Sequence, residues 1–338
     1  MYVDVALDSI ITYAITVGAS DIHFDPILDG IQVRLRIDGL LTEYMLVDAT
    51  DADMLVNRIK VFSGMDISEK RLPQDGRWEW SVKSYAVTMR VSSLPSLYGE
   101  AIVCRLMGNE GVHKNLLELG MDVELQEKIA ALLKRPYGLI TICGPTGSGK
   151  TATLYAMLRM LNLKETKLIC LEDPVEATIE GAIQIGINEK IGFTFSKGLR
   201  TVLRQDPDSI MIGEIRDNET AQLAVKAALT GHRVITTVHT NTALGVIGRL
   251  VDMGVEPYLL HATLIGSLSQ RLVRRIDSTT HSYQGRLGLF EYLEIPFSDI
   301  DWDHVEQYMF TSLQDSAHQA INSGITTLEE VHRAGILL

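Results

Sequence analysis

Cysteine is scarce in this chain of 338 residues, which has only three. Cys104, Cys143 and Cys170 are far apart and lie within apolar runs, so they predict buried thiols rather than disulfides or zinc ligands. Free thiols are typical of a reducing cytosol. The N-terminal residues lack a basic stretch followed by an apolar run, and no segment reaches the roughly 18 apolar residues of a membrane span. Any contact with a membrane is therefore expected to be peripheral.

Positive charge is also in short supply, since 31 Lys and Arg stand against 43 Asp and Glu, a formal net charge of −12. Because binding to a phosphate backbone needs clustered basic charge, this excess of acid argues against a direct nucleic-acid partner. Arg271, Arg274 and Arg275 form a local basic cluster, which we interpret as a solvated helix face rather than as a nucleic-acid contact. The length exceeds that of a typical single domain, so two domains are expected.

Two different patterns divide the sequence. Over the first hundred residues, short strand-like runs at 31–37, 85–91 and 101–107 alternate with turn signals, and apolar residues at helical spacing occupy 5–17 and 52–62. This pattern predicts a small α+β domain over residues 1–108. Residues 109–117 follow as a polar, glycine-containing stretch and are predicted to be a linker.

Residues 118–338 alternate short, nearly continuous apolar runs with amphipathic segments. The runs at 139–143, 168–171, 209–212 and 233–238 are predicted strands, and segments such as 151–161 and 220–229 are predicted helices. Strands that are apolar on both faces are typical of a parallel sheet covered by helices on both sides. The expected fold class of this domain is α/β with a mostly parallel sheet.

A glycine-rich segment with the pattern G-x-x-x-x-G-K-T follows the predicted strand at 139–143 and opens the next predicted helix. The predicted nucleotide-binding residues are Gly144, Pro145, Thr146, Gly147, Ser148, Gly149, Lys150, Thr151 and Ala152. Glycine lets the backbone wrap closely around an anion, so that N–H groups at a helix N-terminus face the phosphates while Lys150 adds positive charge. Thr151 offers a hydroxyl ligand for Mg²⁺. The segment therefore predicts a site for Mg-ATP.

Two of the predicted strands end in acidic residues. The strand at 168–171 is followed by Glu172, Asp173 and Pro174, and the strand at 209–212 by Gly213 and Glu214. Carboxyl ends of parallel strands meet at one edge of a sheet, so we expect Glu172 and Glu214 to face the triphosphate and orient the attacking water. Glu214 is also a candidate to hold Mg²⁺ through its water shell. A helix-capping acid is the alternative for both, and Asp173 before proline suits a plain turn.

A third polar strand end is His239, which follows the predicted strand at 233–238 and precedes Thr240 and Asn241. Such a histidine is commonly a satisfied structural residue. Beside two acidic strand ends and a phosphate-binding loop, a second role is equally open, that of a sensor of the γ-phosphate.

With these residues in place, the chain resembles the secretion ATPases of type II secretion and type IV pilus assembly over nearly all of its length. Segments 19–24 (Ala-Ser-Asp-Ile-His-Phe), 36–39 (Arg-Ile-Asp-Gly) and 72–77 (Leu-Pro-Gln-Asp-Gly-Arg) look like that family's N-terminal domain. Segments 172–176, 203–217 and 237–241 look like its Asp box, Walker B region and His box. The resemblance implies a RecA-like P-loop ATPase domain preceded by a small PAS-like domain.

The resemblance also implies a homohexameric ring, in which the small domain of one subunit closes over nucleotide bound to the large domain. Arginines of the small domain reach the γ-phosphate in that family, and the matching candidates here are Arg77, Arg90 and Arg105. Such an arginine would stabilise the charge that builds up in phosphoryl transfer. A surface salt bridge is the alternative for each.

Two departures from the family carry expectations of their own. The segment at 19–24 begins almost at once, so we expect the additional N-terminal docking domain of many relatives to be absent. The tetracysteine zinc insert that follows the sequence matching 270–276 is reduced to residues 277–284 without cysteine, so no zinc is expected. This short arrangement looks most like the competence-pilus assembly ATPases of Gram-positive bacteria.

The implied function is a hexameric motor that hydrolyses Mg-ATP to assemble a type IV-like competence pilus or a pseudopilus, with associated secretion or DNA uptake. Its expected partner is an integral-membrane platform protein at the cytoplasmic face of the membrane, through which it would act on pilins indirectly. One alternative is a pilus retraction ATPase, and another is a conjugation motor on DNA, against which the acidic charge counts. A nucleotide-gated scaffold without productive turnover is the alternative from another class, and the presence of Glu172 and Glu214 argues against it.

Overall fold

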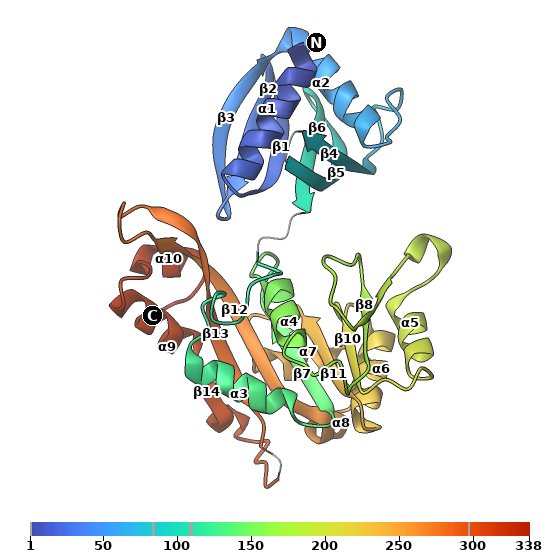
Figure 1. The fold of residues 1–338 in the computed structure, drawn as a ribbon, viewed down its shortest axis with the longest axis vertical. Coiled ribbons are helices and arrows are strands. Elements are labelled where there is room, and N and C mark those ends of the chain that lie inside the picture. The colour runs from blue at the N-terminus through green and yellow to red at the C-terminus, as the bar shows by residue number, and fades with distance from the viewer. Residues whose placement is uncertain (1, 83–84, 108–110, 297) are drawn as a thin grey trace. The chain divides into compact units, whose positions relative to one another are not determined.

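The computed structural model of the chain describes residues 2–82, 85–107, 111–296 and 298–338 (Figure 1). The chain divides into two compact units, Met1–Glu110 and Gly111–Leu338. The predicted domain boundary at residue 108 and the start of the predicted linker at 109 fall within 108–110, outside the described residues.

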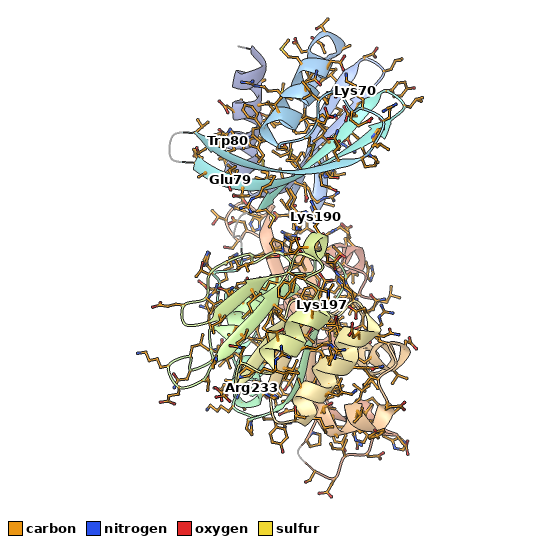
Figure 2. All side chains as sticks on the ribbon, turned by 90° about the vertical axis from the view of Figure 1, so that its right-hand side faces the viewer. Lys70, Glu79, Trp80, Lys190, Lys197 and Arg233 are labelled. Atoms are coloured by element: carbon orange, nitrogen blue, oxygen red, sulfur yellow. The ribbon has the colours of Figure 1, made fainter. Side chains whose placement is uncertain are left out.

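The described part of the small unit is a six-stranded antiparallel sheet with the strand order β3-β2-β1-β6-β5-β4, and two helices pack on one of its faces (Figure 1). Its elements are α1 (Tyr2–Thr16), β1 (Ala19–Ile27), β2 (Gly30–Ile37), β3 (Leu40–Asp48), α2 (Ala49–Phe62), β4 (Gln74–Val82), β5 (Tyr85–Ser96) and β6 (Gly99–Met107). Successive strand residues point to opposite faces. On β4, Trp80 is buried and donates from Nε1 to Asp8 of α1 at 2.7 Å, whereas Glu79 is exposed (Figure 2). An antiparallel sheet with helices packed on one face confirms the predicted α+β class of the unit.

The elements predicted for the small unit are found, with three strands added. Predicted strands 31–37, 85–91 and 101–107 correspond to β2, β5 and β6, and predicted helices 5–17 and 52–62 to α1 and α2. Strands β1, β3 and β4 were not predicted. Polar residues interrupt β1 and β4, and the apolar residues of β3, among them Leu41, Met45 and Leu46, do not alternate with polar ones. Pairing with neighbours in the sheet decides their conformation more than their own composition does.

The large unit, over residues 111–296 and 298–338, is built on an eight-stranded sheet with the order β14-β13-β12-β7-β11-β10-β8-β9. Its elements are α3 (Val123–Leu133), β7 (Gly138–Cys143), α4 (Lys150–Leu158), β8 (Leu168–Glu172), β9 (Ile183–Gly186), η1 (Glu189–Ile191), α5 (Phe195–Val202), β10 (Ser209–Ile212), α6 (Asn218–Leu229), β11 (Arg233–Val238), α7 (Gly245–Asp252), α8 (Pro257–Thr263), β12 (Leu264–Ile276), β13 (Tyr283–Glu294), η2 (Val305–Tyr308), β14 (Met309–Thr311), α9 (Leu313–Asn322) and α10 (Leu328–Arg333). The pairs that join β9, β8, β10, β11, β7 and β12 are parallel, and those of β13 with its two neighbours are antiparallel. The predicted mostly parallel α/β sheet is therefore confirmed.

Helices cover the sheet of the large unit on both faces, so each central strand is buried twice. On β7, for example, Leu139 packs with α5, α6, α7 and α8 in one core, and Ile140 packs with α3 and α4 in the other. All six residues of β7 are buried, as are all six of β11. Burial on both faces explains why the sequence shows continuous apolar runs here instead of alternation.

A buried arginine forms hydrogen bonds between neighbouring segments at the edge of the sheet where the parallel strands begin. Arg233, the first residue of β11, is 8% exposed (Figure 2). Its Nε and Nη2 donate to the carbonyl oxygen of Arg135 at 2.9 and 2.8 Å, and its Nη1 donates to Ser209 Oγ at 3.0 Å. Burial lowers the pKa of this guanidinium. These bonds join β11 to β10 and to the turn before β7 at the N-terminal ends of the parallel strands. The candidate site residues lie at the opposite edge, where these strands end.

The basic cluster at Arg271, Arg274 and Arg275 lies on strand β12, so the predicted solvated helix face is wrong. Arg271 is 8% exposed, and Arg274 pairs with Glu330 of α10 at 2.7 Å. The spacing of the three arginines suits a helix, but long antiparallel pairing between β12 and β13 decides the conformation.

Glu330 joins α10 to the β12–β13 hairpin through a buried ionic cluster. Its side chain is fully buried and accepts hydrogen bonds from the backbone N–H of Arg274 at 2.9 Å, from Arg274 Nε at 3.0 Å and from Arg333 Nε at 2.8 Å. Burial alone would raise the pKa of this carboxyl, but the bonds from Arg333 and Arg274 lower it to about 2.

We expect Glu330→Gln to lower the free energy of unfolding by about 2–3 kcal/mol at pH 7, because it leaves two arginines without their carboxylate. The pKa of the folded state lies below the ordinary value of 4.5, so this stabilisation is present above that value and is lost as the pH falls from about 4.5 towards 2. Urea unfolding of wild type and variant at pH 7 and pH 4 measures the difference. Glu329→Gln, an exposed neighbour in α10, is the control and should change little.

All three cysteines are buried and free among the described residues, as predicted. In the same part of the chain, no helix combines the length and the apolar character that crossing a membrane requires. Nor do three or more His, Cys, Asp or Glu side chains gather anywhere in residues 2–82, 85–107, 111–296 and 298–338 in a way that could hold a metal ion.

Candidate nucleotide site

The glycine-rich segment connects the buried strand β7 to helix α4 and folds as a tight loop. Gly144 and Gly149 have φ angles of 144° and 87°, which side chains other than glycine rarely adopt. A Cβ at Gly144 would lie 2.4 Å from Ser148 Oγ, and one at Gly149 would lie 2.8 Å from Gln270 Nε2. Gly149 caps the N-terminus of α4. The loop is therefore a close-packed cradle that only glycine fits at these two positions.

Lys150, the first residue of α4, lies over this loop. Its Nζ donates to the carbonyl oxygens of Gly144 at 2.8 Å and Pro145 at 2.9 Å, and the residue is 9% exposed. Burial lowers the pKa of its ammonium group, and the negative charge of Glu214 acts in the opposite direction. The ammonium group is thus already held at the mouth of the cradle, where a phosphate would gain most from it.

Two buried polar atoms beside the cradle have no hydrogen-bond partner among the described residues. They are Ser148 Oγ and Gln270 Nε2, and both residues are under 5% exposed. Thr153 Oγ1 of α4 donates to Gln270 Oε1 at 2.6 Å, which fixes the amide with its donor side towards Gly149. Buried donors without partners are costly unless a ligand or rearrangement satisfies them. Together with the cradle, they fit a phosphate group.

The remaining loop residues lie where the sequence places them. Pro145, Thr146 and Gly147 form the exposed rim of the loop, and Thr151 and Ala152 stand half-buried in the first turn of α4. Thr151 therefore offers its hydroxyl at the helix N-terminus, where the helix dipole also favours an anion.

Glu214 lies at the carboxyl edge of the sheet, two residues after β10. The loop that carries it is fixed to β11, since Thr237 Oγ1 donates to the Gly213 carbonyl at 2.7 Å and the Ile215 N–H donates to the Thr237 carbonyl at 3.1 Å. Glu214 accepts a hydrogen bond from Arg216 Nη2 at 2.6 Å, and its other oxygen lies 3.4 Å from His239 Nε2. The structure therefore brings Glu214 and His239 together, as the sequence predicts for strand ends.

The neighbours of Glu214 favour the ionised form of its carboxyl group. Its side chain is 22% exposed, and this partial burial alone would raise its pKa. The hydrogen bond and charge of Arg216, with His239, outweigh burial and hold the pKa of Glu214 below its ordinary value. Arg216 Nη1 also lies 3.9 Å from Asp173 Oδ2, so Asp173 belongs to the same cluster. Glu214 is an ionised carboxylate at neutral pH, able to accept a proton or hold a cation through water.

Glu172 is placed differently from the expectation that it faces the triphosphate. It is the last residue of β8 and is 3% exposed. One carboxylate oxygen accepts from the Tyr155 hydroxyl, and the other accepts from Gln184 Nε2 at 2.9 Å. Burial raises the pKa of Glu172 in spite of these bonds. Because both oxygens are engaged inside the unit, Glu172 joins α4 to β8 and β9 in this conformation instead of addressing a ligand.

Tyr155→Phe tests the structural weight of this network. The Tyr155 hydroxyl donates to Glu172 and accepts from the N–H groups of Glu176 and Ala177, at 3.2 Å each. Its loss leaves buried groups unsatisfied, so we expect the free energy of unfolding to fall by about 1–3 kcal/mol. Chemical denaturation measures it, with Tyr258→Phe, at a 67% exposed position, as the control. Equal stability of the two variants would contradict the assigned network.

A small cavity of 160 Å³ joins the cradle to the His239 loop. It is lined by Gly144, Pro145, His239, Thr240 and Asn241. A larger hollow of 480 Å³ lies where β7 and β11 begin, lined by Tyr137, Ala228, Leu229, Thr230, Gly231 and Ala262. Of these two, the smaller cavity is the candidate for ligand binding, because it is lined by the glycine-rich loop and by His239 at the end of β11.

The loop that follows β11, residues 239–243, is hydrogen-bonded to side chains of strands β12 and β13. The carbonyl oxygen of Asn241 accepts from Arg271 Nη2 at 2.8 Å and from Ser269 Oγ at 3.2 Å. The N–H of Ala243 donates to Glu291 Oε1 at 2.5 Å. Arg271 and Glu291 are both under 10% exposed, so the loop rests on a buried polar base.

The three predicted arginines belong to the small unit and form a row across its sheet. Arg77 of β4 lies opposite Arg90 of β5, which lies opposite Arg105 of β6. Arg77 Nη2 lies 3.4 Å from Glu79, and Arg105 Nε donates to Asp21 at 2.8 Å. The side chains of Arg77 and Arg105 are 68% and 63% exposed. Shared register puts the three arginines on one face of the sheet.

Sequence reasoning missed several residues of the site. Arg216, Tyr155, Gln270, Arg271 and Glu291 were not predicted to take part in it. Arg216 has a local signal, since it lies two residues after Glu214 in the same loop. Gln270 and Arg271 lie at the site because β12 pairs with β7. This pairing joins distant parts of the chain, so no local sequence pattern predicts it.

Comparison with known proteins places these features in a family. The family model described as "Type II/IV secretion system protein" matches residues 2–334. The chain is 49% identical over 270 residues to type II secretion system protein E of Klebsiella pneumoniae, covering 80% of this chain and 54% of that protein. It is 40% identical over 372 residues to type II secretion system ATPase E of Vibrio cholerae, covering 97% and 74%. The chain thus spans about half the length of the first relative and about three quarters of the second.

Solved structures agree with the fold. The pilus retraction motor PilT with bound ADP is similar with a TM-score of 0.68 and 29% identity, covering 96% of this chain and 95% of that one. The ATPase DotB of Legionella pneumophila has a TM-score of 0.77 at 23% identity, covering 98% and 96%, and bears on the fold alone. The predicted P-loop ATPase fold is confirmed by these likenesses. Since the family model covers nearly the whole chain and the Vibrio cholerae relative shares 40% of its residues, the chain belongs to the type II/IV secretion system protein family.

Proposed function

We propose that this chain is an ATPase motor that hydrolyses Mg-ATP at the site on the carboxyl edge of the large unit's sheet. The observation that carries the proposal is the convergence of three features there. Lys150 is held over a glycine cradle, Ser148 and Gln270 present buried donors without partners among the described residues, and Glu214 is an ionised carboxylate whose field acts on Lys150. Each of these suits a triphosphate and its attacking water.

In the proposed reaction, water attacks the γ-phosphorus, the bond to the bridging β–γ oxygen breaks, and ADP, inorganic phosphate and a proton are released. Glu214 orients the water and takes its proton, and His239 senses the γ-phosphate from the same cavity. Lys150 and the backbone of residues 144–151 hold the phosphates. Mg²⁺ bound with ATP would offset phosphate charge, with Thr151 as its hydroxyl ligand and Glu214 reached through water. Glu172 supports this edge through Tyr155.

The remaining parts of the proposal concern assembly. We assign Arg77, Arg90 and Arg105 to contacts with the γ-phosphate held by another copy of the chain, in a homohexamer. Their shared register supports this, because it brings three guanidinium groups onto one face of the sheet, where they can contact the same anion. An arginine supplied from a neighbour would couple hydrolysis to motion between copies.

For the biological role, we propose assembly of a type IV-like competence pilus or pseudopilus, with associated secretion or DNA uptake. The chain would work at the cytoplasmic face of the membrane on an integral-membrane platform protein, and on pilins only through it. The relatives at 40–49% identity are named for type II secretion, which supports assembly over the retraction role in the name of PilT, at 29% identity. The net charge of −12 argues against direct work on nucleic acid.

Phosphate release from Mg-ATP by the purified chain tests this proposal against a nucleotide-gated scaffold. We expect steady turnover, and rings in negative-stain images when a non-hydrolysable ATP analogue is present. Binding of nucleotide without phosphate release would favour the scaffold. Turnover without rings under any nucleotide condition would leave an ATPase and overturn the hexameric motor.

A further inference from the structure

A carboxylate interrupts the arginine row of the small unit. Across neighbouring strands, Arg105 of β6 lies opposite Asp21 of β1, and Asp21 lies opposite Arg36 of β2. With Arg77 and Arg90, the row holds four arginines and one aspartate. Directly opposite residues have Cβ atoms about 4.5–5.5 Å apart, and like charges at that distance repel. Asp21 therefore offsets the repulsion between Arg105 and Arg36, its two neighbours in the row.

Asp21 is bound to its neighbours on both sides. It is 4% exposed, and its Oδ1 accepts from Arg105 Nε at 2.8 Å. Its Oδ2 accepts from Ser20 Oγ at 2.7 Å and lies 3.8 Å from Arg36 Nε. Burial alone would raise the pKa of Asp21, but the bonds from Arg105 and Ser20 hold it below its ordinary value. Asp21 is therefore charged at neutral pH.

The atom by which Asp21 holds Arg105 matters for what the arginine can still do. A bond at Nε leaves both terminal nitrogens of the guanidinium group for another acceptor. The Arg105 side chain is 63% exposed, and no other hydrogen bond or ion pair reaches it within the part of the chain that the structure describes. An arginine fixed at Nε has already lost part of its rotamer freedom, so an incoming anion meets a preorganised fork.

We propose that Asp21 is a positioning residue, which fixes Arg105 at Nε so that its terminal nitrogens contact the γ-phosphate of ATP. Asp21 itself touches no nucleotide and acts through Arg105. The inference rests on the proposed role of Arg105 as a γ-phosphate contact. It gives a function to segment 19–24, whose resemblance to the family assigns it none.

A double-mutant cycle on the full chain tests the inference. Asp21→Ala, Arg105→Ala and the double variant are compared for kcat, for KM, and for the ratio of the affinities for a non-hydrolysable ATP analogue and ADP, measured by calorimetry. We expect each single variant to lower kcat and the affinity ratio about tenfold. The double variant should be no worse than Arg105→Ala alone, because Asp21 has nothing left to position. ADP affinity should stay unchanged throughout.

The chain offers a matched control on the same strand and the same sheet face. Asp25 of β1 accepts from Arg34 Nε at 2.8 Å, but neither residue belongs to the arginine row. Asp25→Ala should match wild type in both readouts. If Asp21→Ala does not fold, Asp21→Asn replaces it in the cycle. The amide keeps the shape of the side chain but removes the charge and one of the two acceptor oxygens that hold Arg105 and Ser20, so we expect a loss in the same direction but smaller.

The possible failures are distinct. Losses of Asp21→Ala and Arg105→Ala that add in the double variant would show that Asp21 acts elsewhere, and wild-type values for Asp21→Ala would show that it does not act at all. Either result overturns the inference while Arg105 keeps its role. Wild-type behaviour of Arg105→Ala would instead remove the proposed role of Arg105, and the inference with it.

Discussion

Replacing Lys150 by alanine should lower ATP turnover by about 100-fold or more and weaken ADP binding by at least about tenfold. The ammonium group is held over the glycine cradle by the carbonyl oxygens of Gly144 and Pro145, so phosphate meets a charge that is already in place. A charge-assisted bond in a partly buried site is stronger than its counterpart in water. Phosphate release and calorimetric titration with ADP measure the two effects.

Lys197 provides the matched control for this substitution. It is an exposed lysine whose Nζ also donates to a backbone carbonyl, that of Gly192 at 2.7 Å, at the start of α5 (Figure 2). Lys197→Ala removes the same charge and the same kind of bond away from the cradle, and should leave both measurements within about twofold of wild type. Unchanged ADP binding and turnover in Lys150→Ala would show that the glycine-rich loop does not hold the phosphates.

Glu214→Gln should reduce turnover by about 100- to 1,000-fold while ADP affinity stays within a few-fold of wild type. The substitution keeps the shape of the side chain but removes the charge that would orient water and accept its proton. Because Arg216 and His239 hold the pKa of Glu214 below its ordinary value, the carboxylate stays ionised into mild acid. Turnover of the wild type should therefore persist as the pH falls to the ordinary range of a glutamate.

Glu219→Gln is the control for Glu214→Gln. Glu219 also accepts a 2.6 Å hydrogen bond from an arginine, Arg200, but it lies in the first turn of α6 and its side chain is 54% exposed. The Glu219→Gln variant should hydrolyse ATP at the wild-type rate. A Glu214→Gln variant that is as active as this control would exclude Glu214 from the chemistry and leave the proposed mechanism without its base.

The central part of the fold could be predicted because its signals are local. Strands β7, β8, β10 and β11 are buried on both faces, and so each appears in the sequence as a short apolar run. The glycine cradle is equally local, since its backbone needs glycine at positions 144 and 149 whatever surrounds it. Glu214 and His239 follow from the rule that parallel strands end at one edge.

The remaining details depend on contacts between distant parts of the chain. The helix predicted at 151–161 ends at Leu158, and the arginine cluster of β12 was interpreted as a helix face, because pairing and packing override local spacing. Nothing near Glu172 indicates that Tyr155 and Gln184 engage both of its oxygens. The alignment of Arg77, Arg90 and Arg105 requires a register across three strands, which only the folded sheet defines.

The two outermost strands of the large unit's sheet are short, which bears on whether this sheet can pair with strands of other molecules. β14 has three residues and β9 has four, whereas β12 and β13 inside the sheet have 13 and 12. A long edge strand exposes a row of unpaired backbone N–H and C=O groups with which a strand of another molecule can pair. A short edge strand exposes few such groups. The sheet of the large unit thus ends in edges that discourage fibrous association through this unit.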